Sequence, residues 1–372
     1  MVSMRVCDAL LPELARSFQV TTGSAATTVS SFVIAYGVLQ LVFGTLGDRY
    51  GKLRMIAVAV MLSMVINAAL IFSPDIHTMS ILRGLAGAAA AGIIPLCMAH
   101  IGDTVPYDKR QEVLARFMSA TISGMIGGQW MGGLFADTIG WEAAFAVLVV
   151  VFGLVSWLMR SELHAPATTS PASSRAARTG FTHQIPLVLR NSWARKILLF
   201  ALIEGALIFS AIVFIPSYLH LQFDLPLTAA GAIVALYGIG GLGYTFFARR
   251  LLGKFGEHGL ARLGGLMIGV GFTLMVVGPH WLWSLSGCLI SGFGFYMLHN
   301  TLQANATQMA PNARGTAVAL FACSLFLGQS AGIGTASMLI DTIGLPAILS
   351  VCLVALPILG LLISHSLKDR AG

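Results

Sequence analysis

Long apolar blocks separated by short charged stretches constrain this chain more than any other feature of its sequence. Residues 30–43 read SSFVIAYGVLQLVF and residues 56–72 read IAVAVMLSMVINAALIF. A helix needs roughly 20 apolar residues to cross the hydrocarbon core of a bilayer, and in lipid only helices and closed barrels satisfy their backbone polar groups. Because the blocks do not alternate apolar with polar residues as barrel strands do, the sequence predicts an all-α membrane protein.

Composition supports this class, since charged residues make up only 10% of the chain, against about 25% in a soluble domain. Counting the apolar blocks gives twelve predicted transmembrane helices. They cover residues 1–17, 27–46, 54–73, 78–101, 115–136, 141–159, 197–220, 228–248, 260–279, 281–304, 314–338 and 345–366.

A polar stretch divides the twelve helices into two sets of six. It begins with a run rich in Ser, Thr, Ala and Pro, which is typical of a flexible linker. The sequence therefore predicts an N-terminal six-helix bundle at 1–160, a cytoplasmic linker at 161–196 and a C-terminal six-helix bundle at 197–372.

Basic residues fall on one side of the predicted membrane. The loops after the second, fourth, sixth, eighth and tenth helices hold most of the Lys and Arg residues, whereas those after the third, fifth, seventh, ninth and eleventh hold none. This alternation follows the positive-inside rule, so we expect a multi-pass protein of the cell (inner or plasma) membrane with both termini in the cytoplasm. Topology accounts for the net charge of +7, and we expect no nucleic-acid partner.

The two predicted bundles carry an internal repeat. Residues 110–140 align without a gap to residues 314–344, and both segments end in DTIG. Parallel repeats of this kind occur in transporters whose substrate site lies between the halves, near the bilayer midplane. By the same alignment the first helix should begin before Met1, so we expect that helix to be truncated at its N-terminus.

The stretch GTLGDRYGKL, between the second and third helices, closely resembles the loop signature of the major facilitator superfamily. The matching positions are Gly44, Leu46, Asp48, Arg49, Gly51 and Lys52. The resemblance covers the whole chain and implies the major facilitator fold. It also implies that this loop latches the two halves together in the outward-open state, with Asp48 facing the start of the eleventh helix near Arg314–Thr316.

Within that superfamily, further motifs resemble the drug:proton antiporter branch, which is arabinose-efflux-permease-like. Asp8 matches a pattern of the first helix there, and Arg83 matches one of the fourth. The fifth helix resembles the antiporter motif, with Gln129 in place of its proline, at Gly124, Gly128, Gly132 and Gly133. The resemblance implies export by antiport, and the missing proline keeps uptake open as an alternative.

Ionisable side chains are rare and costly inside a membrane, so each one in a predicted helix is a candidate functional residue. The proton-coupling and cavity candidates are Arg5, Asp8, Arg83, Glu204 and His299. Asp8 and Arg5 are three residues apart and share a helical face. They form either a fixed ion pair or a proton site, since desolvation favours the protonated carboxyl and a nearby cation favours the carboxylate.

The other candidates also have two readings. Glu204 is either a second proton site or a hydrogen-bonded spectator, and Arg83 is either a counter-charge lining the cavity or a side chain that snorkels to the interface. His299 titrates near neutral pH or makes a polar contact between helices. The glycines that recur every four residues in the fifth and eleventh helices predict close helix packing.

Several classes of function lack support in the sequence. The five cysteines show no metal-binding or disulfide spacing,, and there is no Walker motif for ATP. No pairing of a nucleophile with a base is evident. We therefore expect no metal, no cofactor and no enzymatic activity.

The sequence thus predicts a secondary active transporter, a proton-coupled exporter of a small organic or amphipathic molecule that works by alternating access. The expected partners are that small molecule, protons and the lipid bilayer, and the chain is expected to act as a monomer. An uptake symporter or facilitator of the same fold is the first alternative. A transport-dead membrane sensor is an alternative from another class.

Overall fold

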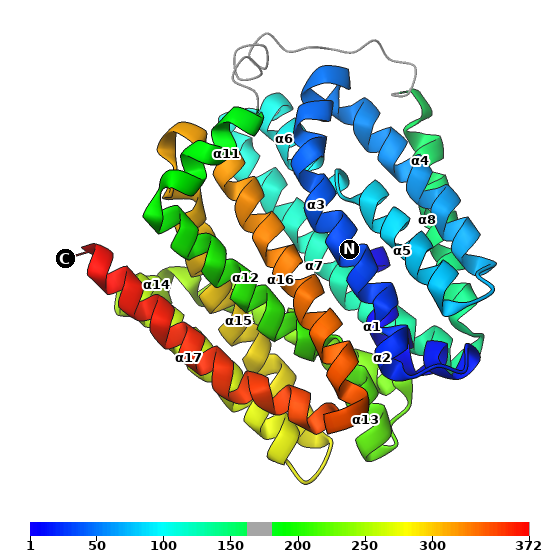
Figure 1. Cartoon of the computed structure of the whole chain (residues 1–372). Coiled ribbons are helices and arrows are strands. Elements are labelled where there is room, and N and C mark those ends of the chain that lie inside the picture. Colours follow the sequence, from blue (N-terminus) through cyan, green and yellow to red (C-terminus); the bar gives the residue numbers. More distant parts are fainter. Residues whose placement is uncertain (162–180, 372) are drawn as a thin grey trace.

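The computed structural model describes residues 1–161 and 181–371 of the chain. Every regular element in those two ranges is a helix. Eight of the described helical segments are long and apolar enough to cross a membrane. Figure 1 shows an N-terminal bundle, coloured blue to teal, beside a C-terminal bundle, coloured green to red.

The N-terminal bundle contains six spans, two of which are broken. The segments are α1 (Val2–Ser17), α2 (Thr22–Ala25), α3 (Thr27–Tyr50), α4 (Lys52–Ile71), α5 (Ile76–Ala90), α6 (Ile93–Thr104), α7 (Tyr107–Thr138) and α8 (Trp141–Leu158). The short α2 leads directly into α3, and α5 leads into α6 after a break at Ala91 and Gly92, so each of these pairs makes one span.

The C-terminal bundle repeats this arrangement. Its segments are α11 (Phe181–Arg190), α12 (Ser192–Ile212), α13 (Ile215–Phe223), α14 (Leu227–Val277), α15 (Leu282–Gln308), a 3-10 turn (Pro311–Ala313), α16 (Arg314–Ile343) and α17 (Leu345–Ala371). The backbone of α14 leaves helical geometry at Gly256, where φ is 64° and ψ is 176°. This kink, which suits a residue without a Cβ atom, divides α14 into two spans.

The structure confirms the predicted fold class, because the helices make twelve spans in two sets of six. The expected linker at 161–196 agrees less closely. Residues 162–180 lie outside the described part, but residues 181–190 form helix α11, and α12 begins at Ser192. The side chain of Asn191 caps the start of α12, since its Oδ1 accepts hydrogen bonds from the backbone nitrogens of Trp193 and Ala194,.

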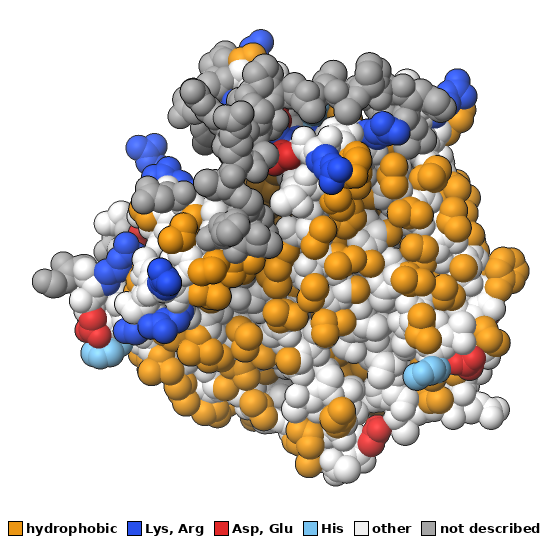
Figure 2. All heavy atoms as spheres, turned by 45° about the horizontal axis from the view of Figure 1, so that its top comes forward, with side chains coloured by type: hydrophobic (Ala, Val, Ile, Leu, Met, Phe, Trp, Pro, Cys, Tyr) orange, Lys and Arg blue, Asp and Glu red, His pale blue; other side chains and the backbone are white. Residues whose placement is uncertain are grey.

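The two ends of the bundles differ in charge. We call the end that carries residues 161 and 181 the linker side, and the opposite end the far side. The turns at 72–75, 139–140, 224–226 and 278–281 lie at the far side and contain no Lys or Arg. Figure 2 shows Lys and Arg side chains gathered near the linker side, above a broad apolar surface.

The bundles touch near the far side and diverge toward the linker side. Ser330 of α16 donates a hydrogen bond to the backbone oxygen of Ser30 of α3 at 3.1 Å, and the rings of Tyr36 and Phe326 meet edge-on at 4.9 Å. Closer to the linker side, none of the α3 residues 38–46 is buried, and none of the described α7 side chains from 109 to 121 is buried either. The bundle interface is therefore open toward the linker side.

Glycines let α12 and α16 pack closely within the C-terminal bundle. A Cβ atom on Gly328 would overlap the backbone of Leu202, one on Gly332 would overlap that of Ala206, and one on Gly205 would overlap that of Leu325. Small residues at such positions allow helix backbones to approach each other in a membrane. In contrast, a Cβ atom on Gly334, in the same helix, would meet nothing within 4 Å.

We predict that Gly328→Val destabilises the folded protein by about 1–3 kcal/mol, because the side chain forces two backbones apart. The thermal unfolding midpoint in detergent measures this effect. Gly334→Val is the matched control, with the same change in the same helix but open space around it. Equal midpoints for the two variants would contradict the packing role of Gly328.

Candidate functional site

The centre of the candidate site is a carboxylate buried between α1 and α7 of the N-terminal bundle. Asp8 is 0% exposed. Its Oδ2 accepts a hydrogen bond of 2.8 Å from Nε2 of Gln129 on α7 and lies 3.4 Å from Nη1 of Arg5. Its other oxygen, Oδ1, has no hydrogen-bond partner. The structure thus brings together Arg5 and Asp8, as the helical spacing predicted, and adds a third group.

That third group is Gln129, and its hydrogen bond with Asp8 was not predicted from the sequence. The sequence marks Gln129 as a departure from the antiporter motif, where a proline is expected, and as a candidate hydrogen-bond donor to substrate or to another helix. In the structure its amide binds the one fully buried carboxylate of α1, and its own Oε1 has no partner. The two residues are 121 positions apart, so no local pattern could join them, although a polar residue in place of an apolar ring is a signal in itself.

The glycines of the same motif place α7 against its neighbours. Cβ atoms on Gly124, Gly128 and Gly132 would meet Met1, Val2 and Val6 of α1. A Cβ atom on Gly133 would meet the backbone of Leu227, at the start of α14 in the other bundle. The motif therefore packs α7 against α1 on one face and across the bundle interface on another.

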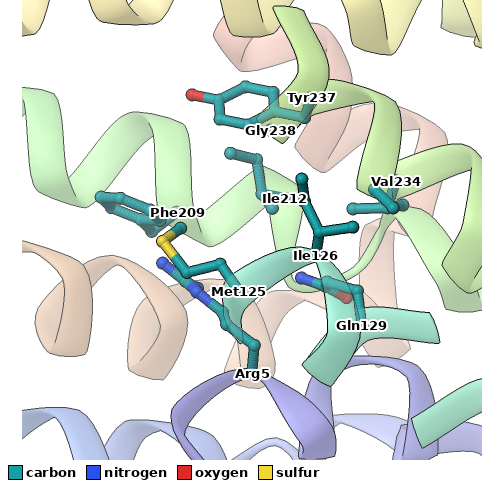
Figure 3. Close-up of a pocket in the computed structure, with 10 residues that line it drawn as sticks. Arg5, Met125, Ile126, Gln129, Phe209, Ile212, Val234, Tyr237 and Gly238 are labelled. Atoms are coloured by element: carbon teal, nitrogen blue, oxygen red, sulfur yellow. The ribbon is translucent and has the colours of Figure 1, made fainter. Parts of the chain in front are cut away.

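A small cavity of about 30 Å³ lies between the bundles beside this site. Arg5 and Gln129 line it from the N-terminal bundle, and Phe209 and Tyr237 line it from the C-terminal bundle. Figure 3 shows Arg5 reaching from α1 toward the ring of Phe209, with Tyr237 on the opposite wall. The guanidinium carbon lies 4.6 Å from the Phe209 ring centroid, which is within the range of a cation–π contact.

A second buried carboxylate lies in the C-terminal bundle. Glu204 of α12 is 0% exposed, and its Oε2 is 2.9 Å from Nδ1 of His299 on α15. The imidazole stacks on Phe295, with 5.1 Å between ring centroids. Oε1 of Glu204 has no partner. The sequence analysis predicted Glu204 and His299 as separate candidate functional residues, and the structure shows that they form a pair.

Arg83 lies apart from the interface cavity in this conformation. It is 0% exposed inside the N-terminal bundle. Its Nη1 donates to the backbone oxygen of Ser3 at 2.7 Å and its Nε donates to that of Thr28 at 3.2 Å, while the guanidinium lies over Phe32. Arg83 thus ties α5 to α1 and α3, and does not snorkel to a membrane surface.

The charged loop around Gly51 is bound within its own bundle. Lys52 forms ion pairs with Asp48, at 3.7 Å, and with Asp103 at the end of α6. The guanidinium of Arg49 lies over the ring of Tyr50. At the start of α16 the hydroxyl of Thr316 donates to Oε1 of Gln184 on α11. In this conformation the structure does not show the expected contact of Asp48 with α16.

A carboxylate that the sequence did not nominate closes the far side. Asp137, in the last turn of α7, accepts hydrogen bonds from the backbone nitrogens of Leu227 and Thr228 and from the Thr228 hydroxyl, at 3.1, 2.6 and 2.7 Å. These donors belong to the first turn of α14, whose N-cap residue is Pro226. A residue of one bundle therefore caps a helix of the other. In most helices the N-cap residue of the same helix accepts these hydrogen bonds.

Asp75 makes the local version of the same cap. Its carboxylate accepts from the backbone nitrogens of His77 and Thr78 and from the Thr78 hydroxyl, all within α5 and its own bundle. The hydrogen bonds from Thr78 lower the pKa of Asp75 below its ordinary value. Asp75 and Asp137 thus make equivalent bonds, and only those of Asp137 cross the interface.

No three described His, Cys, Asp or Glu residues are placed to hold a metal ion together. The site consists instead of two carboxylates, their polar partners and an apolar cavity between two bundles. The family profile described as Major Facilitator Superfamily matches residues 1–333. The chain belongs to the Major Facilitator Superfamily.

Relatives in sequence are transporters of this superfamily. An uncharacterized MFS-type transporter, YybF of Bacillus subtilis, is 22% identical over 324 residues, which is 86% of this chain and 79% of YybF. The multidrug resistance protein Stp of Mycobacterium tuberculosis is 26% identical over 201 residues, covering 54% of this chain and 36% of Stp.

Solved structures show the same fold. A mutant of the nucleoside transporter NupG superposes with a TM-score of 0.81 at 12% identity, covering 98% of this chain and 97% of that one. A D-xylose-proton symporter superposes with a TM-score of 0.75 at 16% identity, covering 98% of this chain and 92% of the other. The chain therefore has the fold of a multi-pass membrane transporter.

Superfamily transporters alternate access by rocking one bundle against the other. The Asp137 cap joins the two bundles at the far side, so separating them there would break its three hydrogen bonds. We predict that Asp137→Ala shifts the population toward the far-side-open state by about 1 kcal/mol, the typical contribution of an N-cap.

Hydrogen–deuterium exchange detects this shift. In Asp137→Ala, residues 38–46 of α3 should exchange more slowly, because the linker side closes when the far side opens. Asp75→Ala is the matched control, which removes an equivalent cap inside one bundle and should change exchange only at the start of α5. Unchanged exchange at 38–46 in Asp137→Ala would show that the cap does not bias the two states.

Proposed function

We propose that this superfamily member is a proton-linked secondary transporter of a small organic molecule, with Asp8 as the proton carrier. The observation that carries the proposal is the burial of the Asp8 carboxylate with one oxygen unpaired. A buried carboxylate is costly when it is ionised and incompletely hydrogen-bonded. A proton relieves that cost, so the site is suited to taking up and releasing a proton as its surroundings change.

Alternating access supplies the change in surroundings. Gln129, which binds Asp8, also touches the other bundle, because its backbone oxygen lies where a Cβ atom on Gly231 of α14 would be. Arg5 likewise contacts Phe209 of α12. When the bundles separate on the far side, both partners of Asp8 lose neighbours. Rocking therefore changes the environment of the carboxylate.

Glu204 and His299 are proposed as a second proton site. They are a buried carboxylate and an imidazole in direct contact, and imidazole is the side chain that changes charge near neutral pH. Each carboxylate has its bonded partners within one bundle, the N-terminal bundle for Asp8 and the C-terminal bundle for Glu204.

Export is one proposed direction of transport. Relatives of this chain include proteins named as a multidrug resistance protein and a drug efflux pump, both from Mycobacterium tuberculosis. The chain covers about a third of the length of each. The names of these relatives therefore support export as a proposal for this chain. An antiporter of this kind requires that substrate and proton compete for the transporter.

Uptake by co-transport is the second candidate. It is favoured by Gln129 at the position of the antiporter proline, and one protein of the same fold is named as a proton symporter. A symporter requires that proton and substrate assist each other's binding. The two directions thus differ in the sign of the coupling between proton and substrate.

We propose that the linker side faces the cytoplasm of a cell membrane and that a single chain forms the transporter. The concentration of Lys and Arg on that side supports the orientation,. In the opposite state, with the linker side closed, Asp48 would reach the start of α16 near Arg314. There the positive end of the helix favours a carboxylate.

We predict that Asp8→Asn abolishes proton-driven accumulation of substrate but leaves membrane insertion and folding intact. Proteoliposomes with an imposed pH gradient, tested against a panel of organic compounds, measure the accumulation. Glu13→Gln is the control, since Glu13 lies in the same helix but pairs with Arg16 near the far side. Wild-type accumulation in Asp8→Asn would contradict the assignment of the proton carrier.

We predict that Glu204→Gln lowers the number of protons moved per substrate by about one and retains transport, because Asp8 is intact. The substrate gradient that exactly balances an imposed pH gradient reports this ratio. His365→Gln, which changes an exposed imidazole of α17, should leave the ratio unchanged. The same ratio in Glu204→Gln and wild type would identify the pair as a structural contact.

A further inference from the structure

We propose that Arg5 is the binding group for an organic anion, and that protonation of Asp8 frees Arg5 to bind it. The proposal rests on the proposed proton-carrying role of Asp8 and adds the chemical class of the substrate. It is drawn from the placement of the two charges relative to the interface cavity.

The cation faces the cavity and the carboxylate does not. Arg5 lines the cavity, together with Gln129 on the same side, whereas Asp8 is absent from its walls. The contact between Arg5 and Asp8 is loose at 3.4 Å, while the amide of Gln129 binds the carboxylate at 2.8 Å. Gln129 therefore keeps Asp8 in place when Arg5 turns toward another anion.

The cavity has the chemistry of a subsite for one anionic group on an apolar body. Its volume of about 30 Å³ admits one or two water-sized groups, which is the size of a carboxylate. Its walls are otherwise apolar, and Phe209 offers an aromatic face. Tyr237 lines it with a buried hydroxyl that has no partner, and this hydroxyl can donate a hydrogen bond to a bound carboxylate.

The neighbouring ionisable groups leave this role to Arg5. Arg83 of α5 is a further positive group near Asp8. Tyr237 and Tyr296 face Arg5 from α14 and α15. Glu204 of α12 lies near Tyr237 and is bound to His299. Asp8 is thus the carboxylate in contact with Arg5, and its protonation leaves the guanidinium without a counter-charge in apolar surroundings.

When Asp8 takes up a proton, the positive charge of Arg5 is no longer balanced. A bound anion balances that charge again. The proton and the anion therefore assist each other's binding, and linkage makes this assistance equal in both directions. Substrates with an anionic head would travel together with the proton, as in the second candidate direction. A cationic substrate is disfavoured at this subsite, because it would face Arg5.

Equilibrium binding of benzoate to the purified full chain tests the inference. Benzyl alcohol and benzylammonium carry the same ring with neutral and positive charge. Asp8→Asn mimics the protonated carboxyl and should bind benzoate about tenfold more tightly than wild type at neutral pH, within the usual range of coupling between sites. It should not change the binding of benzyl alcohol.

Two double variants locate the effect. Asp8→Asn with Arg5→Gln should lose the gain in benzoate affinity, and its folding is protected because no unpaired carboxylate is left behind. Asp8→Asn with Arg195→Gln, which removes an exposed charge of α12, should keep the gain. Size-exclusion profiles show whether each variant is folded.

The anion subsite and the proton-carrying role of Asp8 can fail independently. Equal benzoate affinity in wild type and Asp8→Asn, a gain that survives Arg5→Gln, or a preference for benzylammonium would overturn the anion subsite. If Asp8→Asn also abolishes proton-driven accumulation, the proton-carrying role stands and only the anion subsite fails. If accumulation persists in Asp8→Asn, the proposed function itself fails.

Discussion

The structure depends on how ionisable groups are held in an apolar interior. Asp8, Arg83 and Glu204 are all fully buried, and each has at least one partner on another helix. Arg83 uses backbone oxygens of α1 and α3, Asp8 uses an amide of α7, and Glu204 uses an imidazole of α15. Because an unpaired buried charge is so unfavourable, these contacts fix which helices are neighbours.

Much of the fold was predictable from the sequence, and less of the site. Apolar length and the alternation of basic loops gave twelve spans, because the bilayer imposes both properties on any helical chain. The pairing of Arg5 with Asp8 followed from helical spacing. Gln129 with Asp8, and Glu204 with His299, could not be predicted, since each contact joins distant positions through packing. Helix α11 was missed because its ten residues lie within a stretch read as linker.

The repeat explains why the two bundles resemble each other in shape but not in chemistry. The glycines that seat α16 against α12 correspond to those that seat α7 against α1, so packing is preserved in both halves. The charged groups are not preserved, since Arg83 aligns with Cys288 and Asp8 with Ile212. Packing tolerates few alternatives once helices are in contact, whereas a polar group can be lost from one half after the other has taken over its role.

The duplicated DTIG segment has a consequence for the contacts between the bundles. Its first copy supplies Asp137, which caps α14, and its second copy supplies Asp341, whose carboxylate lies beside Gly23 of α2, across the interface. The far side is therefore closed at two places related by the repeat. The charged loop that faces the linker side has one complete copy, at Gly44–Lys52. The repeat therefore keeps an aspartate at both far-side contacts between the bundles, whereas the charged stretch of the linker side is complete in the N-terminal half alone.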